Sequence, residues 1–173
     1  YVLLAVTGIF STFTYLALLV EGTAGHAYVP FGVSLYGIAG LVGITIAGRR
    51  GDSRMIRLNA LAAAVMVVSA IAGLLALGAG SGLGMFAVIA VFGMAAGALP
   101  TVATTIFLHA GQRNQDLASS VYVVTFQVGI ASGSAVGAAV VDAGYLSGTL
   151  ISTGVLGALA FTVLALWSRT LLR

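Results

Sequence analysis

The sequence contains no cysteine and no lysine, and only 6% of its 173 residues are charged. Without cysteine, disulfide bonds and thiolate metal sites are excluded. Two histidines far apart in the sequence make poor metal ligands, so we expect no metal and no cofactor. There is no nucleophile–base pair and no phosphate-binding loop, so nothing favours an enzyme. A soluble domain carries about 25% charged residues, so the scarcity of charge also excludes an ordinary soluble protein.

Apolar residues take the place of the missing charge. They make up 60% of the chain, and the mean hydropathy is +1.15. A helix needs roughly 20 apolar residues to cross a bilayer, and chain breaks at charged or Gly-rich stretches leave six runs of about that length. Such long apolar runs favour helices, because helices satisfy their own backbone in lipid. The sequence therefore predicts an all-α membrane protein in which residues 1–173 form one bundle of six transmembrane helices, spanning about 1–20, 30–48, 56–77, 83–108, 117–141 and 145–167.

All seven cations are arginines, and they fall on one side of this predicted topology. Four lie in the loop after the second span, one follows the fourth span, and two lie in the tail, whereas the loops of the other side carry none. Basic loops stay in the cytoplasm, so both ends of this segment are predicted to be cytoplasmic in a bacterial plasma membrane. The arginines lie only between apolar runs, so the net charge of +3 reflects membrane topology. We therefore expect no nucleic-acid partner.

The loop from Gly43 to Arg57 resembles the second copy of the loop signature of the major facilitator superfamily, which joins the eighth and ninth helices of those transporters. The positions that match are Gly43, Gly48, Arg49, Asp52 and Arg57. The segment from Leu117 to Asp142, which contains the fifth span, is similar to the eleventh helix of the drug:proton antiporter branch, which includes sugar-efflux permeases. The resemblance implies that the six helices are the C-terminal half of a twelve-helix transporter.

This resemblance also implies a function, the efflux of a small organic solute by rocking of two six-helix bundles. In that setting Asp52 belongs to a gating loop that contacts the other bundle. Its carboxylate is equally well placed to cap the following helix. The membrane partners are then lipid and an N-terminal six-helix half, and because the chain starts at Tyr1 and not at Met, we expect it to be part of a longer polypeptide.

Hydroxyl and amide side chains inside the predicted spans are the candidates for a substrate cavity. The first span has three candidates at helical spacing, Thr7, Ser11 and Thr14. The fourth span has two, Thr101 and Thr104, which follow Pro100. The fifth span has Gln127 near its middle. Buried hydroxyls often bond only to their own helix. An amide is less easily satisfied that way, so Gln127 is expected to face the interior of the protein.

Three glycines of the fifth span, Gly129, Gly133 and Gly137, recur every fourth residue and predict a face for close helix packing. We expect this face to pack inside the chain, and a dimer contact is the alternative.

No predicted span has an ionisable residue near its centre, whereas proton relays in membranes usually need one. Two other functions stay open at this stage. The chain is alternatively a non-transporting six-helix subunit that acts as a partner in a larger membrane complex, or a half-size transporter that forms homodimers.

Overall fold

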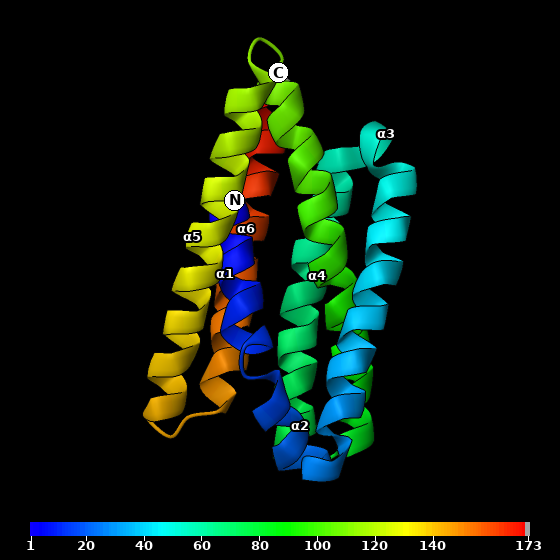
Figure 1. Ribbon diagram of the computed structural model, residues 1–173, viewed down its shortest axis with the longest axis vertical. Helices are drawn as coiled ribbons and strands as arrows, with labels where there is room; N and C mark the ends of the chain where they lie inside the picture. The colour runs from blue at the N-terminus through cyan, green and yellow to red at the C-terminus, as the bar shows by residue number, and fades with distance from the viewer. Residues whose placement is uncertain (172–173) are drawn as a thin grey trace.

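The computed structural model describes residues 1–171, without the side chains of residues 50–55, 110 and 168–171. Seven helical elements follow one another in this part of the chain, and it contains no strand: α1 (Val2–Phe13), α2 (Leu16–Ala24), the 3-10 helix η1 (His26–Tyr28), α3 (Val29–Gly78), α4 (Gly82–Ala110), α5 (Gln115–Asp142) and α6 (Ser147–Leu171). Figure 1 shows them as one bundle of roughly parallel and antiparallel helices. The predicted all-α fold is confirmed.

Five helical segments are long and apolar enough to cross a membrane, and α1 with α2 forms a sixth that is bent by 42°. The sequence predicts one continuous first helix, and that prediction is wrong at Thr14 and Tyr15. The N–H of Tyr15 bonds to the carbonyl of Thr12 at 3.1 Å, three residues back and not four, so the last turn of α1 is tightened. The Thr14 hydroxyl donates a hydrogen bond to the carbonyl of Phe10 at 2.8 Å. The bend therefore arises from hydroxyl and backbone bonding, without a proline.

The second and third predicted spans both lie in α3, which is assigned helical over all 50 residues. A straight helix of that length would measure about 75 Å. Figure 1 shows α3 folding back on itself, so that its two apolar segments run antiparallel. We call residues 29–49 the first limb and Ile56–Gly78 the second limb. The predicted interhelical loop is thus a reversal within a stretch of helical backbone.

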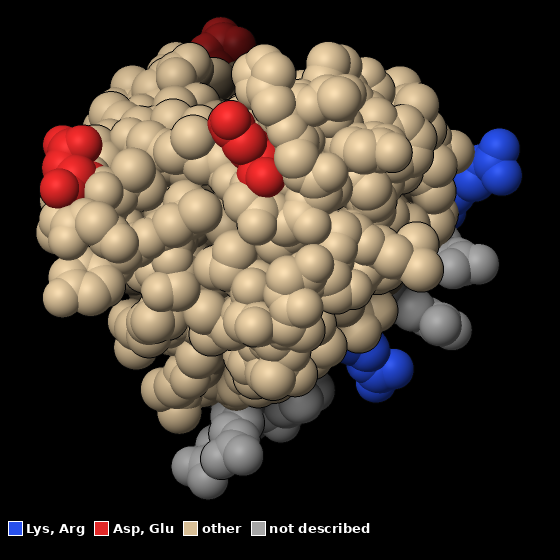
Figure 2. All heavy atoms as spheres, turned by 90° about the horizontal axis from the view of Figure 1, so that it is seen from below, with Lys and Arg blue, Asp and Glu red and all other residues tan. Residues whose placement is uncertain are grey.

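The described arginines distinguish the two ends of the bundle. The reversal of α3, the α4–α5 connection and the last turns of α6 lie together at the upper end in Figure 1, and the α5–α6 connection lies at the lower end with α2. Arg49, Arg57 and Arg113 belong to the upper end, whereas Glu21 and Asp142 belong to the lower end. Figure 2 looks at the lower end and shows acidic side chains on it, with arginines only at its margin. The described arginines therefore share one end, as the sequence predicts.

Glycines set the spacing between several helices. The backbone of α5 approaches α1 at Gly129, Gly133 and Gly137, and a Cβ atom at any of these positions would overlap α1. The first limb of α3 approaches α4 in the same way at Gly43, Gly93 and Gly97. Larger side chains fill the centre of the bundle, among them Met66, Met85, Ile89, Leu99 and Leu164, which are all at most 1% exposed.

Candidate functional site

The three hydroxyl candidates of α1 do not share one environment. Ser11 is completely buried and Thr7 is 8% exposed, whereas Thr14 is exposed. The carbonyl of Thr7 lies against Gly133 of α5. Thr7 and Ser11 are therefore packing positions inside the bundle and not positions on an open face. The 3.6-residue repeat groups all three residues correctly on one stripe, but neighbouring helices cover most of that stripe.

Ser11 belongs to a buried hydroxyl cluster that joins α1 to α6. Its Oγ lies 3.2 Å from Oγ1 of Thr153, and Oγ1 of Thr12 lies 2.7 Å from the same atom. The Thr153 hydroxyl donates to the carbonyl of Gly8 at 2.6 Å, and the Thr12 hydroxyl donates to that of Thr149 at 2.9 Å. In an apolar surrounding such bonds are worth about 1 kcal/mol each in membrane helices, so this cluster fixes α1 against α6.

Thr14 makes a different contact, with α5. Its Oγ1 lies 3.0 Å from Oγ of Ser134, and both side chains remain partly accessible. Gln127 lies seven residues before Ser134 and therefore on the same side of α5, and it is exposed. Among the candidates, Thr14 and Gln127 are the ones that the structure leaves open to a ligand or to another bundle.

The hydroxyls of α4 bond within their own helix. Thr101 donates to the carbonyl of Gly97 at 3.1 Å and Thr104 to that of Pro100 at 2.9 Å. The Pro100 carbonyl also accepts the phenol of Tyr122 from α5 at 3.1 Å. The link between α4 and α5 thus comes from a tyrosine that the sequence did not mark as a cavity residue.

A buried amide lies elsewhere than expected. Asn59 in the second limb of α3 has no exposed surface, and its Oδ1 accepts a hydrogen bond from the phenol of Tyr1. Its Nδ2 has no hydrogen-bond partner. In the sequence Asn59 lies close to the arginine-rich loop, which hides the fact that its side chain turns into the bundle.

The sequence also missed a continuous set of aromatic rings, which we call the aromatic chain. Phe13 stacks on Tyr36 with ring centres 4.7 Å apart, and Phe10 meets Phe13 at 5.6 Å. Five contacts of 4.7 to 6.3 Å join Phe92, Tyr36, Phe13, Phe10, Phe126 and Tyr122 in that order, and Phe107 follows at 5.4 Å. Six of these seven rings are only partly buried. The chain crosses four elements, α4, α3, α1 and α5, which no local sequence pattern connects.

The residues of the loop signature have separate surroundings. Gly43 lies against the backbone of Met94, where a Cβ atom would overlap the carbonyl. Gly48 has open space around it, and Arg49 and Arg57 are exposed. Asp52 lies outside the residues whose side chains are described, so its contact with a helix end or with another bundle stays a prediction.

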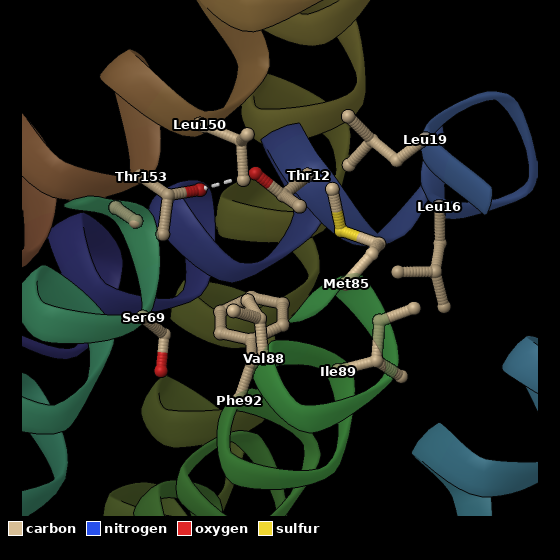
Figure 3. Close-up of a pocket in the computed structure, with 11 residues that line it drawn as sticks. Thr12, Leu16, Leu19, Ser69, Met85, Val88, Ile89, Phe92, Leu150 and Thr153 are labelled. Atoms are coloured by element: carbon tan, nitrogen blue, oxygen red, sulfur yellow. Dashed lines mark hydrogen bonds between the residues drawn. The ribbon is translucent and has the colours of Figure 1, made fainter. Parts of the chain in front are cut away.

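A small cavity lies between α1, α2, α3, α4 and α6 (Figure 3). It measures about 10 Å³, which is room for roughly one water molecule. Leu16, Leu19, Met85, Ile89 and Phe92 make its wall mostly apolar, with Ser69 and the Thr12–Thr153 pair at its edge. A solute does not fit there. Within the described part of the chain, no group of three His, Asp or Glu side chains could hold a metal.

Comparison with known proteins points to a transporter. Over 92% of its length the chain is 27% identical to chloramphenicol efflux pumps from two strains of Mycobacterium tuberculosis. The chain is distantly similar to bacterial efflux transporters. It spans about 40% of the length of these relatives. No protein-family model matches the sequence, and no solved structure matches it. Together with the helices this describes a multi-pass membrane protein that is distantly similar to efflux pumps.

Proposed function

We propose that this chain is the C-terminal half of a secondary active transporter of the major facilitator type, which exports a small organic solute. The observation that carries the proposal is the similarity to efflux pumps along nearly the whole chain, at about two-fifths of their length. A six-helix bundle is the unit expected for half of such a transporter, and rocking of two bundles would expose a midplane cavity to each side in turn.

The geometry of the bundle supports this proposal at one face. Thr14 and Gln127 are exposed near the middle of their spans, although polar side chains are costly against lipid. A neighbouring bundle or a water-filled cavity would remove that cost. The membrane is then the bacterial plasma membrane, with the arginine-rich end in the cytoplasm.

Transport is tested in a strain without its major drug pumps that expresses the polypeptide carrying this chain. Inside-out vesicles are supplied with chloramphenicol, a sugar and a nucleobase, with and without a proton gradient. We expect uptake of at least one of these solutes to depend on the gradient. Uptake equal to that of vesicles without the protein, for all three solutes, would contradict the proposed function and favour a non-transporting subunit.

The gating loop has its own test in the same vesicles. Asp52→Asn removes the negative charge of the loop signature, and we expect transport to fall about 10-fold while insertion into the membrane is unchanged, because a lost charged contact costs about 1.5–3 kcal/mol. Asp142→Asn at the opposite end is the matched control and should transport normally. Unaltered transport by Asp52→Asn would leave the carboxylate with a capping role at most.

A further inference from the structure

The buried hydroxyl cluster between α1 and α6 has more oxygen–oxygen contacts than protons to fill them. Oγ1 of Thr153 lies 2.6 Å from the carbonyl oxygen of Gly8 and 2.7 Å from Oγ1 of Thr12. Oγ1 of Thr12 lies 2.9 Å from the carbonyl oxygen of Thr149. Each hydroxyl carries one proton, and a carbonyl carries none that it can donate. Two protons therefore serve three contacts, and one pair of oxygens at most 2.9 Å apart has no proton between them.

Ser11 takes part in none of these three contacts and brings a further oxygen close to them. Its hydroxyl donates to the carbonyl of Gly8 in its own helix at 2.9 Å. Its Oγ also lies 3.2 Å from Oγ1 of Thr153 and 3.5 Å from the carbonyl oxygen of Thr149. Four oxygens thus form a ring with sides of 2.7 to 3.5 Å, which we call the oxygen ring and which consists of the hydroxyls of Ser11, Thr12 and Thr153 and the carbonyl of Thr149.

The oxygen ring has nearly the size of a cation site. Hard cations take oxygen ligands at about 2.3–2.6 Å, so neighbouring ligands lie about 3.3–3.7 Å apart. The two longer sides of the ring, 3.2 and 3.5 Å, are already near this spacing, and the two shorter sides would lengthen by about 0.5–1 Å. A cation would also remove the conflict in the ring, because it attracts the oxygen lone pairs that face each other there without a proton.

Space for a water ligand lies next to the oxygen ring. The small cavity of about 10 Å³ is lined by Thr12 and Thr153, and Figure 3 shows their hydroxyls meeting at its edge. Ser69 lines the same cavity, and its buried Oγ has no hydrogen-bond partner. A cavity of this volume admits roughly one water molecule. The ring oxygens and one water would together surround a cation without any charged side chain.

The position of the ring in the fold favours positive charge. Thr12 lies in the last turn of α1, which ends at Phe13, and the C-terminal end of a helix carries partial negative charge. Interrupted membrane helices use such ends and their carbonyls to coordinate Na⁺. Thr153 lies beyond the first turn of α6, so the positive end of that helix has little effect there. Because the ring carries no formal charge, it suits a monovalent cation better than a divalent one.

We propose that the oxygen ring is a binding site for a small alkali cation, Na⁺ or Li⁺, held between α1 and α6 without a carboxylate. The hydroxyls of Thr12 and Thr153 are its central ligands. The larger K⁺ would need a wider ring and binds more weakly. The bound cation joins the last turn of α1 to α6 and so holds the bend between α1 and α2 in place. This role does not depend on the proposed transport function.

Binding is measured directly with radioactive Na⁺ on the purified polypeptide carrying this chain, in a scintillation proximity assay. Choline chloride keeps the ionic strength constant and replaces all other sodium in the buffer. We expect saturable binding that LiCl displaces and that KCl displaces about 10-fold less well.

Substitutions of single hydroxyl groups separate cation binding from helix packing. Thr153→Val keeps nearly the same shape but removes a ligand oxygen, so it should weaken Na⁺ binding by about 10-fold or more. Thr153→Ser keeps the oxygen and should restore binding. Thr162→Val on the same helix is the matched control and should bind normally, because the Thr162 hydroxyl is exposed and donates to the carbonyl of Ala158 in its own helix. Thr12→Val repeats the test from α1 and covers the case in which Thr153→Val fails to fold.

Three results would each overturn the cation site and leave the hydroxyls with the role of joining two helices. They are the absence of saturable Na⁺ binding, displacement by KCl as effective as by LiCl, and a loss of binding in Thr162→Val equal to that in Thr153→Val. Uptake of a solute in the vesicle assay together with such a result would leave the transporter standing without this site. Selective Na⁺ binding without any uptake would support the site and contradict the proposed transport function.

Discussion

Two helix contacts of this bundle are built on glycine, and they differ in where the glycines lie. In the α1–α5 contact all three glycines belong to α5, and they meet side chains as well as backbone of α1, such as Val6 at 2.8 Å from a Cβ built at Gly129. In the contact of the first α3 limb with α4, both helices contribute glycines. A Cβ built at Gly97 would overlap the carbonyl of Gly40, which is itself a glycine.

This difference determines at which glycines an added methyl group is tolerated. A side chain can rotate away from an added methyl group, whereas a helix backbone moves only as a whole. In the α3–α4 contact the closest atoms to Gly43, Gly93 and Gly97 are all backbone atoms, whereas in the α1–α5 contact Gly133 and Gly137 meet carbonyl oxygens and only Gly129 meets mainly a side chain. The α1–α5 contact therefore has freedom to adjust at Gly129 alone.

The largest expected effect belongs to the α3–α4 contact. Gly97→Ala forces the first limb of α3 away from α4, and we expect a loss of about 3 kcal/mol or more in the free energy of unfolding. An SDS titration of the purified protein in mixed micelles, followed by circular dichroism, measures this loss. A change below about 1 kcal/mol would show that the two backbones do not touch.

An intermediate effect is expected in the α1–α5 contact. A Cβ at Gly129 would meet Cβ and Cγ1 of Val6, both at 2.8 Å. Cγ1 can rotate away and Cβ moves only with α1, so the loss should be about 1–2 kcal/mol in the same titration. The double variant Gly129→Ala with Val6→Ala removes the contact with Cγ1 and keeps the one with Cβ, so it should recover part of the loss. If Gly129→Ala costs as much as Gly97→Ala, the proposed difference between the two contacts is wrong.

Gly37 gives the smallest effect and serves as the control for both. It lies in the first limb of α3 three residues before Gly40, but nothing lies within 4 Å of a Cβ built on it. Gly37→Ala should leave stability unchanged or raise it by up to about 1 kcal/mol, since alanine is the better helix former. Destabilisation beyond about 1 kcal/mol would mean that Gly37 packs against a partner absent from the structure.

Periodicity and composition predicted those features of the structure that depend on the residues of one helix or one loop alone. The hydropathy of the spans predicted the all-α membrane fold, and the four-residue repeat of Gly129, Gly133 and Gly137 marked the face of α5 that lies against α1. Gly93 and Gly97 in α4 have the same spacing, but a repeat of only two residues is too short to predict a packing face.

Periodicity and composition could not predict contacts between helices that are distant in the sequence. The aromatic chain depends on rings from four elements, and the burial of Ser11 depends on hydroxyls of α6 that lie about 140 residues away. The break at Thr14 and Tyr15 also needed the structure, because threonine and tyrosine occur within many straight helices. The gating residue Asp52 remains a prediction from resemblance alone.

Cysteine accessibility tests most directly whether the face that carries Thr14 and Gln127 lines a water-filled cavity. The native chain has no cysteine, so each introduced thiol is the only one it contributes. Gln127→Cys probes this face, and Leu159→Cys, on an exposed position of α6, is the matched lipid-facing control. In the polypeptide carrying this chain, in intact membranes, we expect a water-soluble maleimide to label Gln127→Cys and to leave Leu159→Cys unlabelled. Equal labelling of both positions, or no labelling of Gln127→Cys, would contradict a solvent-filled transport cavity on this face.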